Sequence, residues 1–236
     1  MGGIPTNIKC EVVSPTKDNS EAVVPGLMAI GEACVSVHGA NRLGTNSLLD
    51  LIVFGRAGAQ RAAEIIKPGS RVPEANGNSQ ERALTRFDRF RHSKGGNKPG
   101  EVRPLMQEAM QTGFGVFRRD DTLQEGLKKL KALRDPLDRV TVDDDSLLWN
   151  VALVSALELA NLAEQALVIA ASASNRTESR GAHAREDYHK RDDENWLKHT
   201  VAWKDEQWNV AFAYRPVRLD TLSNEVQTFP PAVRTH

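Results

Sequence analysis

An apolar pattern at helical spacing runs from near position 46 to near position 66. Leucine, isoleucine, phenylalanine and alanine recur there every three or four residues, and Asn46 or Ser47 would each make a good N-cap. The run ends at Lys67, Pro68 and Gly69, because proline cannot continue a helix and glycine favours its end. We therefore predict one helix across this stretch.

A shorter apolar run precedes that helix. The Val-Pro-Gly sequence at 24–26 predicts a turn, and Leu27 to Ile30 then predict a buried strand that ends at Gly31 and Glu32. A loop rich in glycine and asparagine joins the strand to the helix. A strand followed by a helix favours an α/β arrangement for the first 66 residues or so.

Helical patterns dominate the middle of the chain. A polar stretch from 68 to 100 holds one short helical pattern near 80–91, and three longer patterns then cover about 102–117, 122–134 and 144–174. The last begins with Asp143, Asp144 and Asp145, and acids suit a helix N-terminus. Short connections between these helices favour an antiparallel bundle.

The end of the chain combines a charged stretch with a predicted β-hairpin. Residues 176–194 are densely charged, with alternating signs from Arg185 to Glu194, and apolar and polar residues then alternate at 200–203 and 208–214. Arg180, His183 and Arg185 could form a proton relay, but their charged neighbours favour structural ion pairing. The whole pattern predicts an α+β fold.

Composition excludes several classes of protein. The 236 residues contain 31 Lys and Arg against 31 Asp and Glu, so the net charge is zero, which argues against a nucleic-acid binder. Cys10 and Cys34 indicate free thiols rather than a disulfide scaffold. The apolar stretch 147–173 is interrupted by Asn, Gln and Glu, which favours a core helix over a membrane span. The N-terminus shows no targeting signal.

One segment, residues 31–48, favours ligand binding. The common phosphate-loop, zinc-ligand and nucleophile-elbow motifs do not occur in the sequence. The segment joins a predicted strand end to a helix N-terminus and presents Glu32, which could accept sugar hydroxyls, and Arg42, which could grip a carboxylate with two hydrogen bonds. On spacing alone, a ligand site and a structural loop with Arg42 paired to Glu32 remain equal alternatives.

Several stretches of this sequence match the sequence motifs of one known protein family. They are the Gly-Glu at 31–32, VHGANRLG at 37–44, NSLLDL at 46–51, VFGR at 53–56, MGGIPTN at 1–7, and the charged stretches at 176–188 and 191–200. Together they resemble the succinate dehydrogenase and fumarate reductase flavoprotein family, and the C-terminal stretches resemble succinate dehydrogenase most. Between Glu32 and Cys34 this chain is one residue shorter than the usual family pattern.

The resemblance implies a cofactor and a substrate contact. Glu32 would hydrogen-bond the ribityl part of FAD, and Ser47 and Leu48 would meet the flavin ring. Arg42 would clamp a carboxylate of succinate. The family's dinucleotide fingerprint, its flavin-linked histidine and its capping domain would lie upstream, so no catalytic set is complete here and we expect this chain alone to be inactive. No metal site is expected.

The resemblance also implies a domain order. Residues 1–68 would be the C-terminal part of an FAD-binding α/β domain, and 69–100 a linker with a short helix. Residues 101–175 would form the helical domain, and 176–236 a small C-terminal α+β region with the hairpin.

For the intact subunit, the implied reaction is oxidation of succinate to fumarate in the tricarboxylic acid cycle, with electrons passing through FAD and iron–sulfur clusters to quinone. Its partners would be succinate or fumarate, an iron–sulfur subunit, membrane anchor subunits and the N-terminal FAD and capping part. It would lie peripherally on the cytoplasmic face of a bacterial inner membrane or the matrix face of the mitochondrial one. Fumarate reductase, L-aspartate oxidase, and a non-catalytic remnant or split subunit that only binds other chains remain open alternatives.

Overall fold

The structure is a computed structural model that describes residues 2–34, 37–71, 74 and 76–232. Its helices and strands follow in chain order: β1 (Glu11–Val13), β2 (Val23–Met28), the 3-10 helix η1 (Gly31–Ala33), α1 (Asn46–Ile65), α2 (Gly77–His92), α3 (Pro99–Phe114), β3 (Phe117–Arg118), α4 (Asp120–Ala132), α5 (Arg134–Asp138), α6 (Val151–Asn175), β4 (Ala184–Arg185), α7 (Asp193–Trp196), β5 (Lys198–Lys204) and β6 (Val210–Pro216). The mixed α+β class is confirmed.

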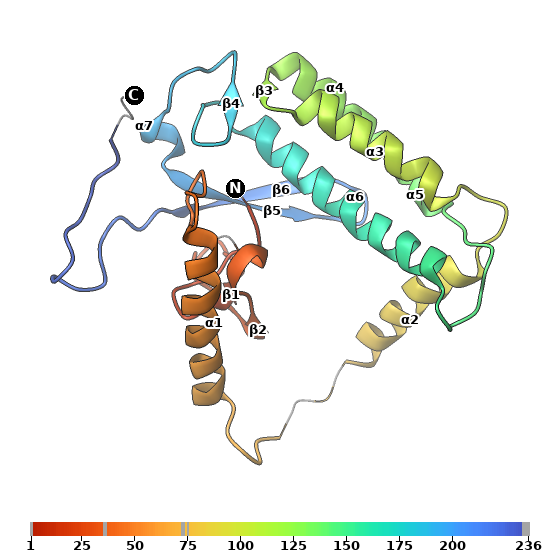
Figure 1. The fold of residues 1–236 in the computed structure, drawn as a ribbon, viewed down its shortest axis with the longest axis horizontal. Coiled ribbons are helices and arrows are strands. Elements are labelled where there is room, and N and C mark those ends of the chain that lie inside the picture. The colour runs from red at the N-terminus through yellow and green to blue at the C-terminus, as the bar shows by residue number, and fades with distance from the viewer. Residues whose placement is uncertain (1, 35–36, 72–73, 75, 233–236) are drawn as a thin grey trace.

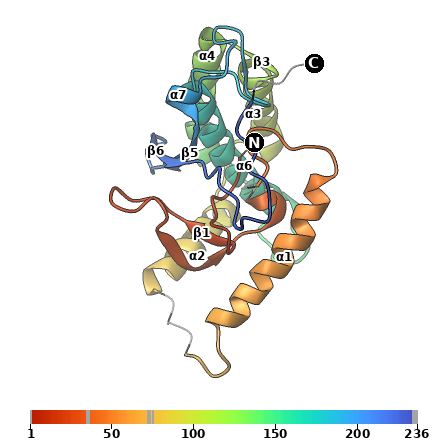
Figure 2. The ribbon, with the colours of Figure 1, turned by 90° about the vertical axis from the view of Figure 1, so that its left-hand side faces the viewer.

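Two lobes and a connecting hairpin make up the molecule. Figure 1 shows α1 with the β1–β2 hairpin in one lobe and α3, α4 and α6 side by side in the other. The view in Figure 2 confirms this separation and shows the β5–β6 hairpin between the lobes. The N-terminal segments therefore contact the C-terminal region directly, although the helical bundle separates them in sequence.

The N-terminal strand differs from the sequence prediction. The predicted turn at 24–26 lies inside β2, which pairs antiparallel with β1. The register of this pairing shifts along the strands, because Glu11 faces Met28 whereas Val13 faces Val23. Gly26 has a φ of 78° and allows this distortion. The strand predicted at Leu27 to Ile30 is confirmed only in part, because β2 includes Leu27 and Met28 but ends there, and Leu27 is 50% exposed rather than buried.

The predicted helix at 46–66 is confirmed as α1. Its cap differs from the expectation, since the helix begins at Asn46 and the N-cap is Thr45, in the left-handed region with a φ of 64° and without a side-chain capping bond. Of its residues only Asp50 and Gly58 are buried. Gly58 lets the helix pack closely on the segment after β2, because a Cβ there would lie 3.2 Å from Ile30 Cγ2.

The helical bundle holds the main hydrophobic core. Helix α4 packs against both α3 and α6, and Figure 1 shows it running opposite to them, so the antiparallel bundle is confirmed. Gly113 of α3 and Gly126 of α4 meet where the two helices touch, and a Cβ on Gly113 would lie 2.7 Å from Gly126 Cα. Leu123, Leu159 and Leu167 are fully buried.

The last long helix begins later than predicted. Asp143 to Asp145 precede it in a loop, where the Asp144 carboxylate accepts from Ser146 N and Lys98 pairs with Asp143. Asn150 is the N-cap, and its side chain accepts from Leu153 N at 2.8 Å. Within the described residues, α6 is the one helix long and apolar enough to span a membrane by length and composition, yet nine of its residues are buried. It packs against α3 and α4, as expected for the core helix that the sequence predicted.

The C-terminal region contains the predicted hairpin. Strands β5 and β6 pair antiparallel from Lys198 opposite Pro216 to Lys204 opposite Val210. The sequence patterns did not indicate the short parallel pairing of β3 with β4. The Arg215 guanidinium on β6 donates to both Glu21 carboxylate oxygens at 2.5 and 2.7 Å and to Thr6 O at 3.1 Å. The hairpin is thereby fastened to the N-terminal lobe.

Candidate functional site

Arg42 lies in an exposed loop, residues 37–45, directly before α1; we call this the Arg42 loop. Its Nη1 donates to the Ser47 hydroxyl oxygen at 2.6 Å. This contact holds the guanidinium across the N-terminus of α1, where backbone N–H groups point outward without partners inside the helix. The loop thus presents a cation and a helix N-terminus together, an arrangement that suits a carboxylate.

Ser47 and Leu48 lie in the first turn of α1, as predicted. The Ser47 hydroxyl contacts Arg42, a contact that sequence reasoning did not anticipate because it assigned Ser47 to the flavin. Leu48 is 66% exposed, and its N–H donates to Thr45 O at 3.2 Å. The Thr45 side chain does not cap the helix, so it accepts no hydrogen bond from the backbone amides of the first turn.

Glu32 lies in η1 with an exposed side chain. Among the described residues it forms no ion pair with Arg42, so the structure does not contain the alternative in which these two side chains satisfy each other. The stretch that joins them includes residues 35–36, which lie outside the described part of the chain. Glu32 and Arg42 are both exposed.

A buried pair that sequence reasoning missed joins the Arg42 loop to α1. His38 Nε2 lies 3.1 Å from Asp50 Oδ2, and the two side chains are 6% and 3% exposed. The second Asp50 oxygen, Oδ1, is buried without a hydrogen-bond partner in the described structure. An acid on the otherwise exposed helix α1, twelve residues from a histidine, offered no recognisable spacing signal. The pair ties the start of the loop to α1.

The C-terminal region also contacts this loop. Ala182 N donates to Ala40 O at 3.1 Å. Residues 180–183 form a tight turn, in which Arg180 N donates to His183 O at 2.8 Å and His183 N donates back to Arg180 O at 3.0 Å. The loop is consequently held at His38, Ala40 and Arg42 by three separate contacts.

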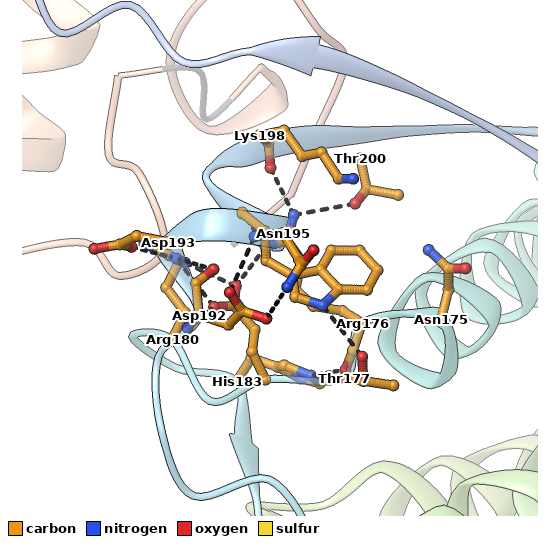
Figure 3. A network of polar contacts seen from close by, with 12 residues as sticks. Asn175, Arg176, Thr177, Arg180, His183, Asp192, Asp193, Asn195, Lys198 and Thr200 are labelled. Atoms are coloured by element: carbon orange, nitrogen blue, oxygen red, sulfur yellow. Dashed lines mark hydrogen bonds and ion pairs between the residues drawn. The ribbon is translucent and has the colours of Figure 1, made fainter.

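A buried carboxylate organises the charged segment behind this turn. Glu178 is fully buried and accepts from Arg176 at 2.5 Å, from Arg180 at 2.7 and 3.0 Å, and from Asp192 N at 2.9 Å. Burial acts to raise the pKa of Glu178, but these hydrogen bonds outweigh it and leave the pKa below its ordinary value. Figure 3 shows Arg180, Asp192 and Asp193 gathered in this network.

His183 is part of the same packed cluster. Its Nε2 lies 3.0 Å from Arg176 O, and its Nδ1 lies 2.8 Å from Arg118 Nη1. Because a carbonyl oxygen only accepts and a guanidinium only donates, His183 carries its proton on Nε2 and is neutral. Burial, followed by repulsion from nearby arginines, lowers its pKa and favours that state. The predicted structural pairing of this segment is confirmed.

Acid should weaken the charged segment. Hydrogen bonds from Arg185 lower the pKa of Asp187 to about 2, from an ordinary value of 3.8. The folded state therefore binds fewer protons than the unfolded state in this window, so the free energy of unfolding should decrease as the pH falls from about 4 toward 2. We expect the urea midpoint of Asp187→Asn to fall less over this range than that of the unchanged chain. Equal slopes would contradict this assignment.

Comparisons with protein-family models identify the family of this chain. A model described as fumarate reductase flavoprotein C-term matches residues 103–236, more than half of the chain, and an FAD binding domain model matches residues 1–48. The chain belongs to the fumarate reductase flavoprotein C-terminal family. The suspected relationship to this flavoprotein group is confirmed.

Members of this family resemble the chain along its whole length. The succinate dehydrogenase flavoprotein subunit of Rickettsia bellii is 51% identical over 100% of this chain and 40% of its own length. The mitochondrial subunit of Oryza sativa is 48% identical, with 100% and 38% covered. A structure of the Escherichia coli quinol fumarate reductase matches with a TM-score of 0.83 at 35% identity, covering 98% of this chain and 37% of its own. The chain thus spans about two fifths of the length of these relatives.

Proposed function

We propose that this chain forms the C-terminal part of a succinate dehydrogenase flavoprotein subunit, which oxidises succinate to fumarate. The observation that carries the proposal is the exposed Arg42, held by Ser47 at the N-terminus of α1, within a region matched by the FAD binding domain model. Identity also favours this activity, since the Rickettsia bellii succinate dehydrogenase subunit is 51% identical and the Mycobacterium tuberculosis fumarate reductase subunit 34%.

The residues at the site fit FAD. Glu32 offers an exposed carboxylate to the hydroxyls of the ribityl chain, and Leu48 offers an exposed apolar side chain to the ring. The first turn of α1 lacks a side-chain cap, and its N–H groups suit the electron-rich edge of a flavin. When bound, FAD supplies a hydride acceptor for the substrate C–H bond.

Arg42 would bind one carboxylate of succinate. A guanidinium can donate two parallel hydrogen bonds to the two oxygens, which fixes the orientation of the dicarboxylate as well as its charge. The bond to Ser47 limits the positions that the guanidinium can adopt before substrate arrives. This orientation would direct the C–H bond of succinate toward the cofactor.

The complete subunit would act within a larger assembly. We infer that electrons leave FAD through an iron–sulfur subunit to a quinone, and that anchor subunits hold the assembly on a bacterial inner membrane at its cytoplasmic face or on a mitochondrial inner membrane at its matrix face. The N-terminal FAD and capping part would complete the site. The domain order predicted above, 1–68, 69–100, 101–175 and 176–236, belongs to the same proposal.

An exchange experiment tests this function. The aligned C-terminal two fifths of the Rickettsia bellii subunit are replaced by this chain, and the hybrid subunit is produced with the relative's partner subunits. We expect a yellow, flavin-containing hybrid that reduces an electron-accepting dye when succinate is added. The unchanged relative, produced in the same way, is the control for assembly.

Other outcomes separate the alternatives. A colourless hybrid beside a yellow control would contradict the flavoprotein assignment and favour a non-catalytic remnant. A hybrid that reduces fumarate with a reduced viologen much faster than it oxidises succinate would favour fumarate reductase. A hybrid that releases hydrogen peroxide with L-aspartate rather than with succinate would favour L-aspartate oxidase.

A further inference from the structure

Gly181 lies closer to the Arg42 loop than any other residue type would allow. A Cβ at this position would lie 2.5 Å from Ala40 O, 2.6 Å from Ala40 C and 2.7 Å from Ala40 Cβ. These distances are too short for real contacts, and two of the three atoms belong to the backbone, which cannot rotate away. Its φ of 59° also lies in the region that favours glycine. Any side chain here would push the loop and the turn apart.

The turn 180–183 is held rigidly from behind. Arg180 is fixed by the buried Glu178 and by Asp193 at 2.7 Å, and His183 is fixed by Arg118 and Arg176 O. Figure 3 shows Arg180 and His183 of the turn near Arg176, which follows α6, and Asp193 of α7. Because the turn is anchored on this side, a change in spacing at Gly181 would be taken up mainly by the exposed Arg42 loop.

The hydrogen bond that joins the turn to the loop is accepted by Ala40, two residues before Arg42, the proposed substrate-binding residue. Ala182 N donates to Ala40 O, and Arg42 follows in the same exposed stretch. A displacement of Ala40 therefore moves the backbone that carries the guanidinium, even though Ser47 holds its tip. Misplacing a substrate-orienting group by about an ångström can cost about 100-fold in rate.

We propose that the turn 180–183 is a positioning element for the Arg42 loop, and that Gly181 is the positioning residue that sets their separation. The C-terminal region would thus determine how the site grips a dicarboxylate without touching the substrate. The part of this inference that concerns substrate rests on the proposed function, whereas the contact itself does not.

The contact is tested first on the full chain, labelled with ¹⁵N for NMR. In Gly181→Ala we expect the Ala182 amide to exchange with solvent at least about tenfold faster, with shifted resonances for residues 38–44. Gly69→Ala is the matched control, because Gly69 also has a positive φ, 78°, but has no atom within 4 Å of its Cβ position. Unchanged exchange at Ala182 in Gly181→Ala would overturn the proposal.

A second variant separates contact from backbone strain. Asparagine tolerates the left-handed region better than alanine but still carries a Cβ. Gly181→Asn should therefore accelerate Ala182 exchange about as much as Gly181→Ala does. If the asparagine variant behaves like the unchanged chain, strain alone explains the alanine result and the positioning role is wrong.

The consequence for substrate is measured in the hybrid subunit. We expect Gly181→Ala to raise the KM for succinate about tenfold while the flavin content stays unchanged, because the carboxylate-binding group moves and the remaining cofactor contacts do not. A purely structural defect would instead lower flavin content and thermal stability together. If the hybrid with Gly181 unchanged is itself inactive, that result counts only against the proposed function. The positioning role of Gly181 is then still tested by the rate of Ala182 amide exchange.

Discussion

Replacing Arg42 by lysine should reduce kcat/KM for succinate by about 100-fold or more in the hybrid subunit. Lysine keeps the positive charge, but its ammonium cannot present the planar pair of donors that binds both oxygens of a carboxylate. It would also lose the geometry in which guanidinium Nη1 donates to the Ser47 hydroxyl at 2.6 Å. Steady-state kinetics with succinate and an electron-accepting dye measure the effect.

The control for this variant is Arg71→Lys, the same exchange at an 85% exposed surface position. Its kinetics should match those of the unchanged hybrid. Flavin content must be equal in both, because Arg42 is assigned to the substrate and not to the cofactor. Undiminished succinate turnover in Arg42→Lys would show that the bidentate grip is not used, and the site would then need another carboxylate ligand.

Removing the Glu178 carboxylate should cost the full chain about 3–5 kcal/mol of unfolding free energy, because it leaves two arginines and a backbone amide without their shared buried acceptor. In Glu178→Ala, Arg176 and Arg180 would face each other with like charges, and their side chains are only 15% and 17% exposed. Urea unfolding followed by far-ultraviolet circular dichroism measures the loss.

Asp121→Ala provides the comparison. Asp121 also accepts two hydrogen bonds from an arginine, Arg119, but the two side chains are 63% and 56% exposed, so solvent replaces the lost contact and the unfolding midpoint should barely change. Glu178→Gln should lie between the two variants, since it keeps the shape but loses the charge. If Glu178→Ala is as mild as Asp121→Ala, the buried network does not stabilise the fold.

Elements with a strong periodic pattern were predictable from the sequence. The helix at 46–66 and the hairpin of β5 and β6 carry clear periods of 3.6 and 2 residues, and both are present. The two-residue strands β3 and β4 are too short to show a period, and they pair only because the bundle brings distant segments together. The late start of α6 was missed because the three acids before it resemble a helix N-terminus.

The candidate site was predictable only in part. Its location at the start of α1 followed from the strand-to-helix connection and from the family resemblance. The contacts inside it did not, because they depend on tertiary structure: Ser47 binds Arg42, Asp50 reaches His38, and Ala182 reaches Ala40. The sequence shows that residues 176–194 are densely charged, but it does not show that Glu178 is the buried centre of the network.

The hydrogen-bonded ion pair between Arg215 and Glu21 joins residues that are 194 positions apart in the sequence. Contacts at such separations form late in folding, because a long chain must first be brought into place. During synthesis, the N-terminal lobe must therefore wait until Arg215 has been made before it gains this support. The order of synthesis thus places the docking of the N-terminal lobe against the β5–β6 hairpin after the helical bundle has been synthesised.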